Sequence, residues 1–177
     1  DMVTAAKQLY RRITETTDGR IVCVTILVFI GIVGVFIFRN YGISYDEYVE
    51  MQMVLWHREY ILTGEHWSEI ERNLEYYGLF FNFISIIPYL LFNMIQTGGD
   101  FVQTYSAGMK SGSLYQFKHL STFLFSLIAY ASVALFVKDL RGWKFAWLGI
   151  VLLALCPRFW GHSFFNPKDI PFAALFA

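Results

Sequence analysis

Charged residues are scarce in this chain: Asp, Glu, Lys and Arg together make up only 16% of its 177 residues. The 14 basic and 14 acidic residues balance, so the totals indicate neither a nucleic-acid-binding surface nor an acidic tail. A Walker loop, a dinucleotide fingerprint, a zinc-type Cys/His spacing and a GxSxG element are also absent from the sequence. These absences argue against the classes of enzyme that depend on those motifs.

Cysteine is nearly absent as well. The two cysteines, Cys23 and Cys156, both lie in apolar segments, and the topology derived below places them near opposite faces of a membrane. A disulfide needs Cα atoms within about 7 Å, so we expect no bridge between them. Both are expected to act as small buried hydrophobic residues.

Apolar residues dominate instead. Hydrophobic residues make up 56% of the chain, aromatic residues 19%, and the mean hydropathy is +0.44, which indicates that lipid surrounds much of it. The chain begins at Asp1 and ends inside an apolar run, 170–177, which is too short for a bilayer that needs about 20 residues. We therefore expect an all-α, multi-pass transmembrane protein, seen here as an N-terminal fragment that ends at the start of a further span.

Three strong transmembrane segments are predicted at 21–38, 119–137 and 143–160. The polar segment before the first span is basic, with Lys7, Arg11, Arg12 and Arg20, and the loop 138–144 holds three cations. By the positive-inside rule both are cytoplasmic, so the residues from about 41 onward and the loop 161–169 lie outside.

The segment 79–95 is ambiguous, because its apolar run is interrupted by Asn82, Ser85, Pro88 and Asn93. If it crossed the bilayer, the basic loop 138–144 would be forced outside, against the charge rule. We therefore favour an interfacial segment within one external loop, 41–117. With that choice, the loops 41–77 and 161–169 face the same compartment.

The external loop has structural signals of its own. Ser44 to Glu47 fits a capping box, and the apolar or aromatic residues Tyr45, Tyr48, Val49, Trp56 and Tyr60 fall on one face at helical spacing. Gly64 is suited to ending that helix. We expect an amphipathic helix on the membrane surface, followed later by a Gly/Ser-rich loop at 98–113.

The first candidate for chemistry is the pair Asp46 and Glu47, directly after the first span. Neighbouring side chains on a helix diverge, so the two carboxylates cannot converge on one point. Because Glu47 serves the capping box, Asp46 is the better catalytic candidate. The alternative is a solvated acid that interacts with the helix dipole.

The second candidate is the stretch 157–171, which places Arg158, His162, Lys168 and Asp169 between two apolar segments. Ionisable groups at membrane depth are costly and usually mark a site. The alternative is that the cations reach lipid headgroups and Asp169 only caps a helix. Lys118 and His119 stand at the mouth of the second span, where a cation either meets a phosphate or snorkels, and Tyr76–Tyr77–Gly78 is typical of membrane-interface aromatics.

Asp46–Glu47, the interfacial helices and the stretch Pro157–Arg158–Phe159–Trp160–Gly161–His162 through Lys168–Asp169–Ile170–Pro171 together resemble a known family. They are similar to the bacterial protein-mannosyltransferase-like and aminoarabinose-transferase-like glycosyltransferases of the GT-C fold, over nearly the whole chain from Ile21. The resemblance implies an inner-membrane transferase with its active site outside and a lipid-linked sugar donor. It carries the role of base to Asp46, with Glu47 as its neighbour, and that of a second acid to Asp169.

The same resemblance implies an inverting displacement in which cations stabilise the departing polyprenyl phosphate. The available residues are Lys118, Arg158, Lys168 and His162. No cofactor is required, and a divalent metal bridging Asp46 and Asp169 is compatible with the residues. The acceptor would be a protein, a lipid or a glycan, with no role for nucleic acid. Where the aminoarabinose branch carries a Lys-Pro-Pro element, this chain has Tyr76–Tyr77–Gly78, so no lysine contact is expected there.

Two other functions compete with the enzyme. A transporter would place ionisable residues in the middle of its spans, whereas the central parts of the three strong spans are free of charge. A non-catalytic membrane scaffold would tolerate Asp46→Asn or Asp169→Asn, which an enzyme would not.

Overall fold

The computed structural model describes residues 18–64 and 80–177, which form helices and no strand. An all-α fold is thereby confirmed for this part of the chain. The elements are α2 (Gly19–Ile37), the 3-10 helix η1 (Phe38–Asn40), α3 (Tyr45–Thr63), α4 (Phe80–Thr97), α5 (Phe101–Ser111), α6 (Ser113–Arg141), α7 (Trp143–Ala154), α8 (Pro157–Phe165) and α9 (Asp169–Phe176).

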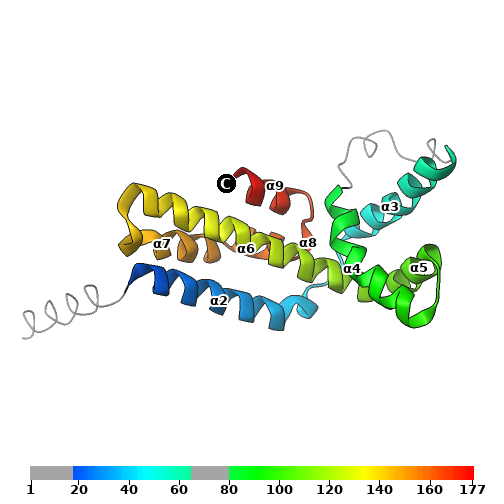
Figure 1. Ribbon diagram of the computed structural model, residues 1–177, viewed down its shortest axis with the longest axis horizontal. Helices are drawn as coiled ribbons and strands as arrows, with labels where there is room; N and C mark the ends of the chain where they lie inside the picture. Colours follow the sequence, from blue (N-terminus) through cyan, green and yellow to red (C-terminus); the bar gives the residue numbers. More distant parts are fainter. Residues whose placement is uncertain (1–17, 65–79) are drawn as a thin grey trace, which may run out of the picture.

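Helices α2, α6 and α7 form an elongated bundle (Figure 1). Gly31 faces Leu127 and Gly34 faces Phe123, so α2 and α6 run antiparallel. Both glycines allow close approach, because a side chain at Gly34 would overlap the Phe123 ring. These three helices share a buried core with α8, which consists of Cys23, Ile30, Phe123, Tyr130, Ala134, Ala146, Ile150 and Phe164.

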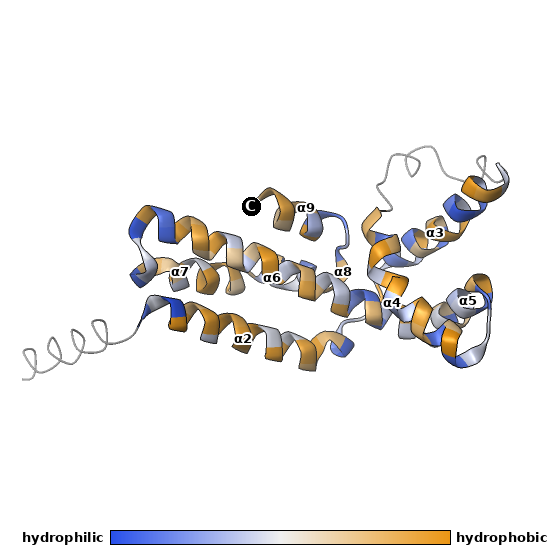
Figure 2. Ribbon diagram, viewed as in Figure 1, coloured by the Kyte–Doolittle hydropathy of each residue, from blue (hydrophilic) through white to orange (hydrophobic). Residues whose placement is uncertain are grey.

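Three helical segments are long and apolar enough to cross a membrane: Gly19–Asn40, Phe80–Thr97 and Ser113–Arg141. The pair α7 and α8 adds a fourth if the two are counted as one bent span. Large apolar side chains remain exposed along α2 and α6, and Figure 2 shows hydrophobic residues along both helices with hydrophilic residues gathered toward the ends. Exposed apolar surface of this extent is typical of contact with lipid.

One end of the bundle carries a group of basic residues with aromatic neighbours. The guanidinium of Arg20 lies 5.2 Å from the centre of the Trp143 ring, and the ammonium of Lys138 lies 5.9 Å from it. The start of α2, the end of α6 and the start of α7 therefore meet there. That this end faces the cytoplasm stays a prediction from the positive-inside rule.

The expected span 143–160 is two helices in the structure. Helix α7 ends at Ala154, and α8 departs from it at an angle of 71°. Pro157 explains the break, because proline has no N–H for the helix ladder and disfavours helical geometry in the residue before it. Cys156 is extended and exposed at this break, not buried as expected. Helix α8 also takes up most of the expected loop 161–169, and only 166–168 remain as a turn.

Helices α3, α4 and α5 gather at the other end of the bundle, beyond the end of α2 (Figure 1). They share a core with the first turn of α6, which consists of Met51, Met53, Val54, Ile86, Leu90, Tyr105, Leu114 and Tyr115. Because α2 and α6 are antiparallel, the segment that joins them leaves and rejoins the bundle at this end. An interfacial position for α4 agrees with that geometry and stays a prediction.

Helix α3 has the predicted ends but a different inner face. Ser44 is the N-cap in a capping box with Glu47, and Gly64 ends the helix in the left-handed conformation at φ 77°. The expected apolar face is largely outward, since Tyr45 is 88% and Tyr48 is 56% exposed. The buried residues are Glu47, Glu50, Met51, Met53 and Val54.

The expected loop 98–113 is largely helical. Asp100 caps α5 by accepting a hydrogen bond from the backbone N–H of Gln103 at 2.8 Å. Gly98 and Gly112, both at positive φ, lie on either side of the helix. Gly98 ends α4 and Gly112 ends α5, so the glycines that suggested a mobile loop are the C-terminal stop signals of two successive helices.

Candidate active site

A pocket of about 330 Å³ lies where the start of α3 meets the turn between α8 and α9. Asp46 and Asp169, the two acids singled out in the sequence, both line it. The complete lining is Ser44, Asp46, Glu50, His162, Phe165, Asn166, Lys168 and Asp169. The two polar loops of the sequence therefore meet at the same end of the bundle.

Stacked aromatic rings hold the two loops together. Tyr41, just after the first span, stacks on Phe164 of α8 with 4.1 Å between ring centres. Phe164 in turn stacks on Phe123 of α6 at 4.8 Å and is fully buried. These contacts join the residue after η1 to α8 and α6, so the pocket is built on packed helices.

The capping box separates the roles of the two adjacent acids. Glu47 Oε2 accepts a hydrogen bond from the backbone N–H of Ser44 at 2.8 Å, and Glu47 is 1% exposed. Asp46 is exposed and lines the pocket, one position earlier on the helix. Of the pair, only Asp46 is placed to receive a proton from a molecule in the pocket.

Asn166 organises the opposite wall. Its Nδ2 group donates to His162 Nδ1 and to Asp169 Oδ2, both at 2.8 Å. Its Oδ1 accepts from the backbone N–H of Asp169 at 2.9 Å and from that of Lys168 at 3.2 Å. Because Nδ1 of His162 is an acceptor here, the neutral ring carries its proton on Nε2. Asn166 thus fixes both the Asp169 carboxylate and the His162 ring.

A buried carboxylate joins the pocket to the α6 helix. Glu50 Oε2 lies 2.8 Å from Lys118 Nζ, and Glu50 Oε1 lies 2.9 Å from Lys168 Nζ. The Lys118 side chain has no exposed surface, whereas that of Lys168 is 30% exposed. Lys168 lines the pocket. Lys118, which we expected at a phosphate, contacts Glu50 and is not among the lining residues.

A second buried pair lies beside the first. His119 Nε2 is 2.7 Å from Glu47 Oε1, and each side chain is 1% exposed. A carboxylate accepts only, so Nε2 carries a proton in this pair. His119 Nδ1 is buried without a hydrogen-bond partner among the described residues. Glu47 is thus occupied by the Ser44 backbone and by His119.

Three further expectations concern Arg158, a metal ion and residues 76–78. Arg158 is exposed on the first turn of α8 and is not among the residues that line the pocket. Within residues 18–64 and 80–177, no group of three His, Cys, Asp or Glu residues is arranged to hold a metal ion. A metal between Asp46 and Asp169 stays a prediction. Tyr76, Tyr77 and Gly78 lie outside the described residues.

Glu50 is the residue that the sequence did not reveal. It follows Glu47 by three positions, so the two share one face of α3, and this spacing was the available signal. The apolar residues of α3 predict a different inner face. Without knowing that Lys118 and His119 lie opposite, nothing in the sequence marks Glu50 as buried.

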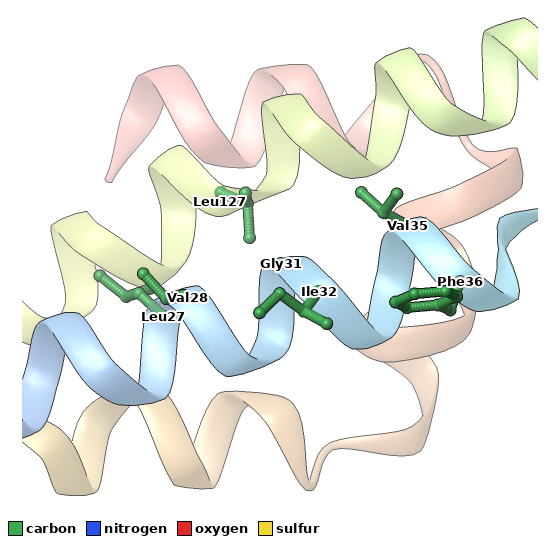
Figure 3. Close-up of a pocket in the computed structure, with 7 residues that line it drawn as sticks. All are labelled: Leu27, Val28, Gly31, Ile32, Val35, Phe36 and Leu127. Atoms are coloured by element: carbon green, nitrogen blue, oxygen red, sulfur yellow. The ribbon is translucent and has the colours of Figure 1, made fainter.

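Two further hollows differ in chemistry. A groove of about 470 Å³ between α2 and α6 is lined only by apolar residues and Gly31 (Figure 3): Leu27, Val28, Gly31, Ile32, Val35, Phe36 and Leu127. It lies along the candidate spans and offers no polar group for chemistry. A hollow of about 420 Å³ beside α3 and α5 mixes apolar residues with Lys110, Tyr48 and Tyr115 but contains no acid. The pocket at Asp46 and Asp169 is therefore the candidate site.

Comparison of the chain with models of protein families, with curated proteins and with solved structures finds no match.

Proposed function

We propose that this chain belongs to a GT-C glycosyltransferase that moves a sugar from a polyprenyl-phosphate donor to an acceptor at the pocket of Asp46 and Asp169. The observation that carries the proposal is the shared lining of that pocket. Two acids from distant parts of the sequence face one space beside a lysine and a histidine. A carboxylate base next to a cation suits acceptor activation together with a phosphate leaving group.

In the proposed reaction, Asp46 takes the proton from an acceptor hydroxyl or amine. The acceptor atom forms a bond to the anomeric carbon as the bond from that carbon to the phosphate oxygen breaks. The electron pair leaves on the phosphate, where Lys168 balances the charge. A single displacement of this kind inverts the anomeric centre. Asp169, held by Asn166, is positioned for hydrogen bonds to the sugar or the acceptor.

The position of the pocket suits a lipid-linked donor. It lies at the end of an apolar bundle, where α3 presents the exposed tyrosines Tyr45 and Tyr48. Aromatic side chains of this kind favour the membrane interface. The basic residues Arg20, Lys138 and Lys144 lie at the opposite end, which suggests a pocket facing outward from a bacterial inner membrane.

A transporter has one observation in its favour. Lys118 and His119 are ionisable, buried and part of the candidate span Ser113–Arg141. Both, however, lie in the first turns of α6, and their partners Glu50 and Glu47 belong to α3, outside the bundle. Their position at the end of the span favours a role in the architecture of the pocket over a route through the membrane.

The test uses the full-length protein in native membranes that contain its acceptors. Labelled polyprenyl-phosphate mannose and polyprenyl-phosphate aminoarabinose are supplied, and the release of polyprenyl phosphate is measured. Asp46→Asn is expected to lower the rate at least about 100-fold, the usual contribution of a positioned base. Asp139→Asn makes the same change on an exposed acid at the other end of α6 and should leave the rate unchanged. Equal rates in Asp46→Asn and the wild type, at equal membrane insertion, would reject Asp46 as the base.

A further inference from the structure

Glu50 contacts two lysines that differ in their surroundings. Lys118, on its Oε2 atom, has no exposed surface, and Lys168, on its Oε1 atom, is 30% exposed at the pocket. Glu50 itself is nearly buried, with 7% of its side chain exposed. A single carboxylate thus ties α3 to α6 on one side and to the turn before α9 on the other.

The charges of this cluster favour an anion at Lys168. The buried ammonium of Lys118 balances the carboxylate of Glu50, as a buried charge requires. The contact between Glu50 and Lys168 therefore fixes the ammonium of Lys168 without cancelling its charge. Asp46 and Asp169 make the rest of the pocket acidic. In such a setting an uncompensated Glu50 would repel a phosphate, and Lys118 removes that repulsion.

We infer that Glu50 is a positioning residue, which holds the Lys168 ammonium at the pocket wall for the phosphate of the lipid-linked donor. This inference rests on the proposed function and assigns a role within the same site. A lysine has a long, flexible stem, and its charge is spread over many positions unless a partner restrains it. Restraint before binding lowers the entropy lost when the phosphate arrives.

A charge-matched variant separates positioning from electrostatics. The double change Glu50→Met with Lys118→Met removes one negative and one positive charge, so the net charge of the pocket is unaltered, and it leaves no side-chain oxygen at position 50 to hold Lys168. Both replacements keep the approximate size of the original side chain. Replacing both partners of a buried pair together also avoids leaving either charge unpaired. Any loss of phosphate affinity then reflects the freedom gained by Lys168.

The experiment measures the binding of undecaprenyl phosphate, a donor lipid without its sugar, to the full-length protein in nanodiscs. Four proteins are compared: the wild type, the double variant, Lys168→Met, and the combination of all three changes. The double variant is expected to bind about tenfold more weakly, the effect of one charge-assisted hydrogen bond. In the Lys168→Met background the same double change should have no further effect, because there is no ammonium left to position.

Two results would overturn the inference while leaving the proposed function standing. One is unchanged affinity in the double variant, and the other is an equal loss whether or not Lys168 is present, which is the sign of a purely structural role. A wild-type protein that fails to bind undecaprenyl phosphate would overturn the proposed function as well. If this double variant does not fold, Glu50→Leu with Lys118→Leu provides the same comparison with another apolar pair.

Discussion

His119 Nε2 and Glu47 Oε1 lie 2.7 Å apart, and both side chains are almost completely buried. The pair joins the first turn of α3 to α6. Glu47 also accepts the backbone N–H of Ser44, so its carboxylate is committed to structure. Adjacent acids in the sequence therefore have separate tasks, with Asp46 in the pocket and Glu47 in the frame that supports it.

Removal of His119 should destabilise the protein. His119→Leu leaves the buried carboxylate of Glu47 without its main partner, at a cost of about 3 kcal/mol. Thermal unfolding of the solubilised full-length protein measures the loss. Asp46→Asn, which changes the neighbouring but exposed acid, should stay within about 0.5 kcal/mol of the wild type. Equal stability of His119→Leu and the wild type would show that the pair contributes nothing.

The contact between α2 and α6 depends on Gly34. A Cβ atom there would overlap the ring of Phe123, which is fully buried, so Gly34→Ala should cost about 1–3 kcal/mol. Gly31 supplies the matched control on the same helix, because its added Cβ would lie at an ordinary 3.8 Å from Leu127. Gly31→Ala should therefore leave the unfolding temperature nearly unchanged. Equal losses in the two variants would contradict the observed register of the helices.

Tyr105 connects α5 to α3. Its hydroxyl donates to the backbone carbonyl of Met51 at 2.8 Å, and the side chain is fully buried. Tyr105→Phe should cost about 1 kcal/mol, because the carbonyl of Met51 loses its side-chain partner. Tyr45→Phe, at a position that is 88% exposed, is the control and should leave the free energy of unfolding unchanged. Unfolding in detergent measures both.

The same residue predicts a pH dependence. Burial raises the pKa of Tyr105, so the unfolded chain loses this proton at a lower pH than the folded chain. The contribution of Tyr105 to stability is complete below the ordinary tyrosine pKa of about 10 and declines as the pH rises above it. The wild type should therefore lose stability more steeply than Tyr105→Phe above about pH 10. Parallel slopes would exclude Tyr105 as the cause.

Local chemistry made part of this structure predictable. The capping box at Ser44 and the glycine at Gly64 mark the ends of α3, and both act through residues close in sequence. Pro157 also carried a signal, but the apolar run around it suggested a continuous span where the structure has a sharp bend. The glycines around α5 are typical of a loop, whereas Asp100 between them is the N-cap that begins this helix.

The interior of the site was not predictable in the same way. Whether Lys118 meets lipid phosphate or a buried carboxylate depends on which face of α3 lies opposite, and that is decided by contacts between distant segments. The aromatic residues of α3 suggested that their own face packs inward. Instead, Glu47 and Glu50 lie on the inner face, because they pair there with His119 and Lys118 of α6. The placement of Asp46 and Asp169 on one pocket depended on the antiparallel arrangement of α2 and α6.

The most direct test of this account is the side of the membrane on which each loop lies. In a full-length protein with Cys23 and Cys156 replaced by alanine, single cysteines at Ser44, Asn166 and Lys144 are treated with a membrane-impermeant thiol reagent. Ser44 and Asn166 line the same pocket, and Lys144 lies at the opposite end of the bundle. The account predicts that Ser44→Cys and Asn166→Cys react from one side and Lys144→Cys from the other. Reaction of Ser44→Cys and Asn166→Cys from opposite sides would contradict it, since no common site could then exist.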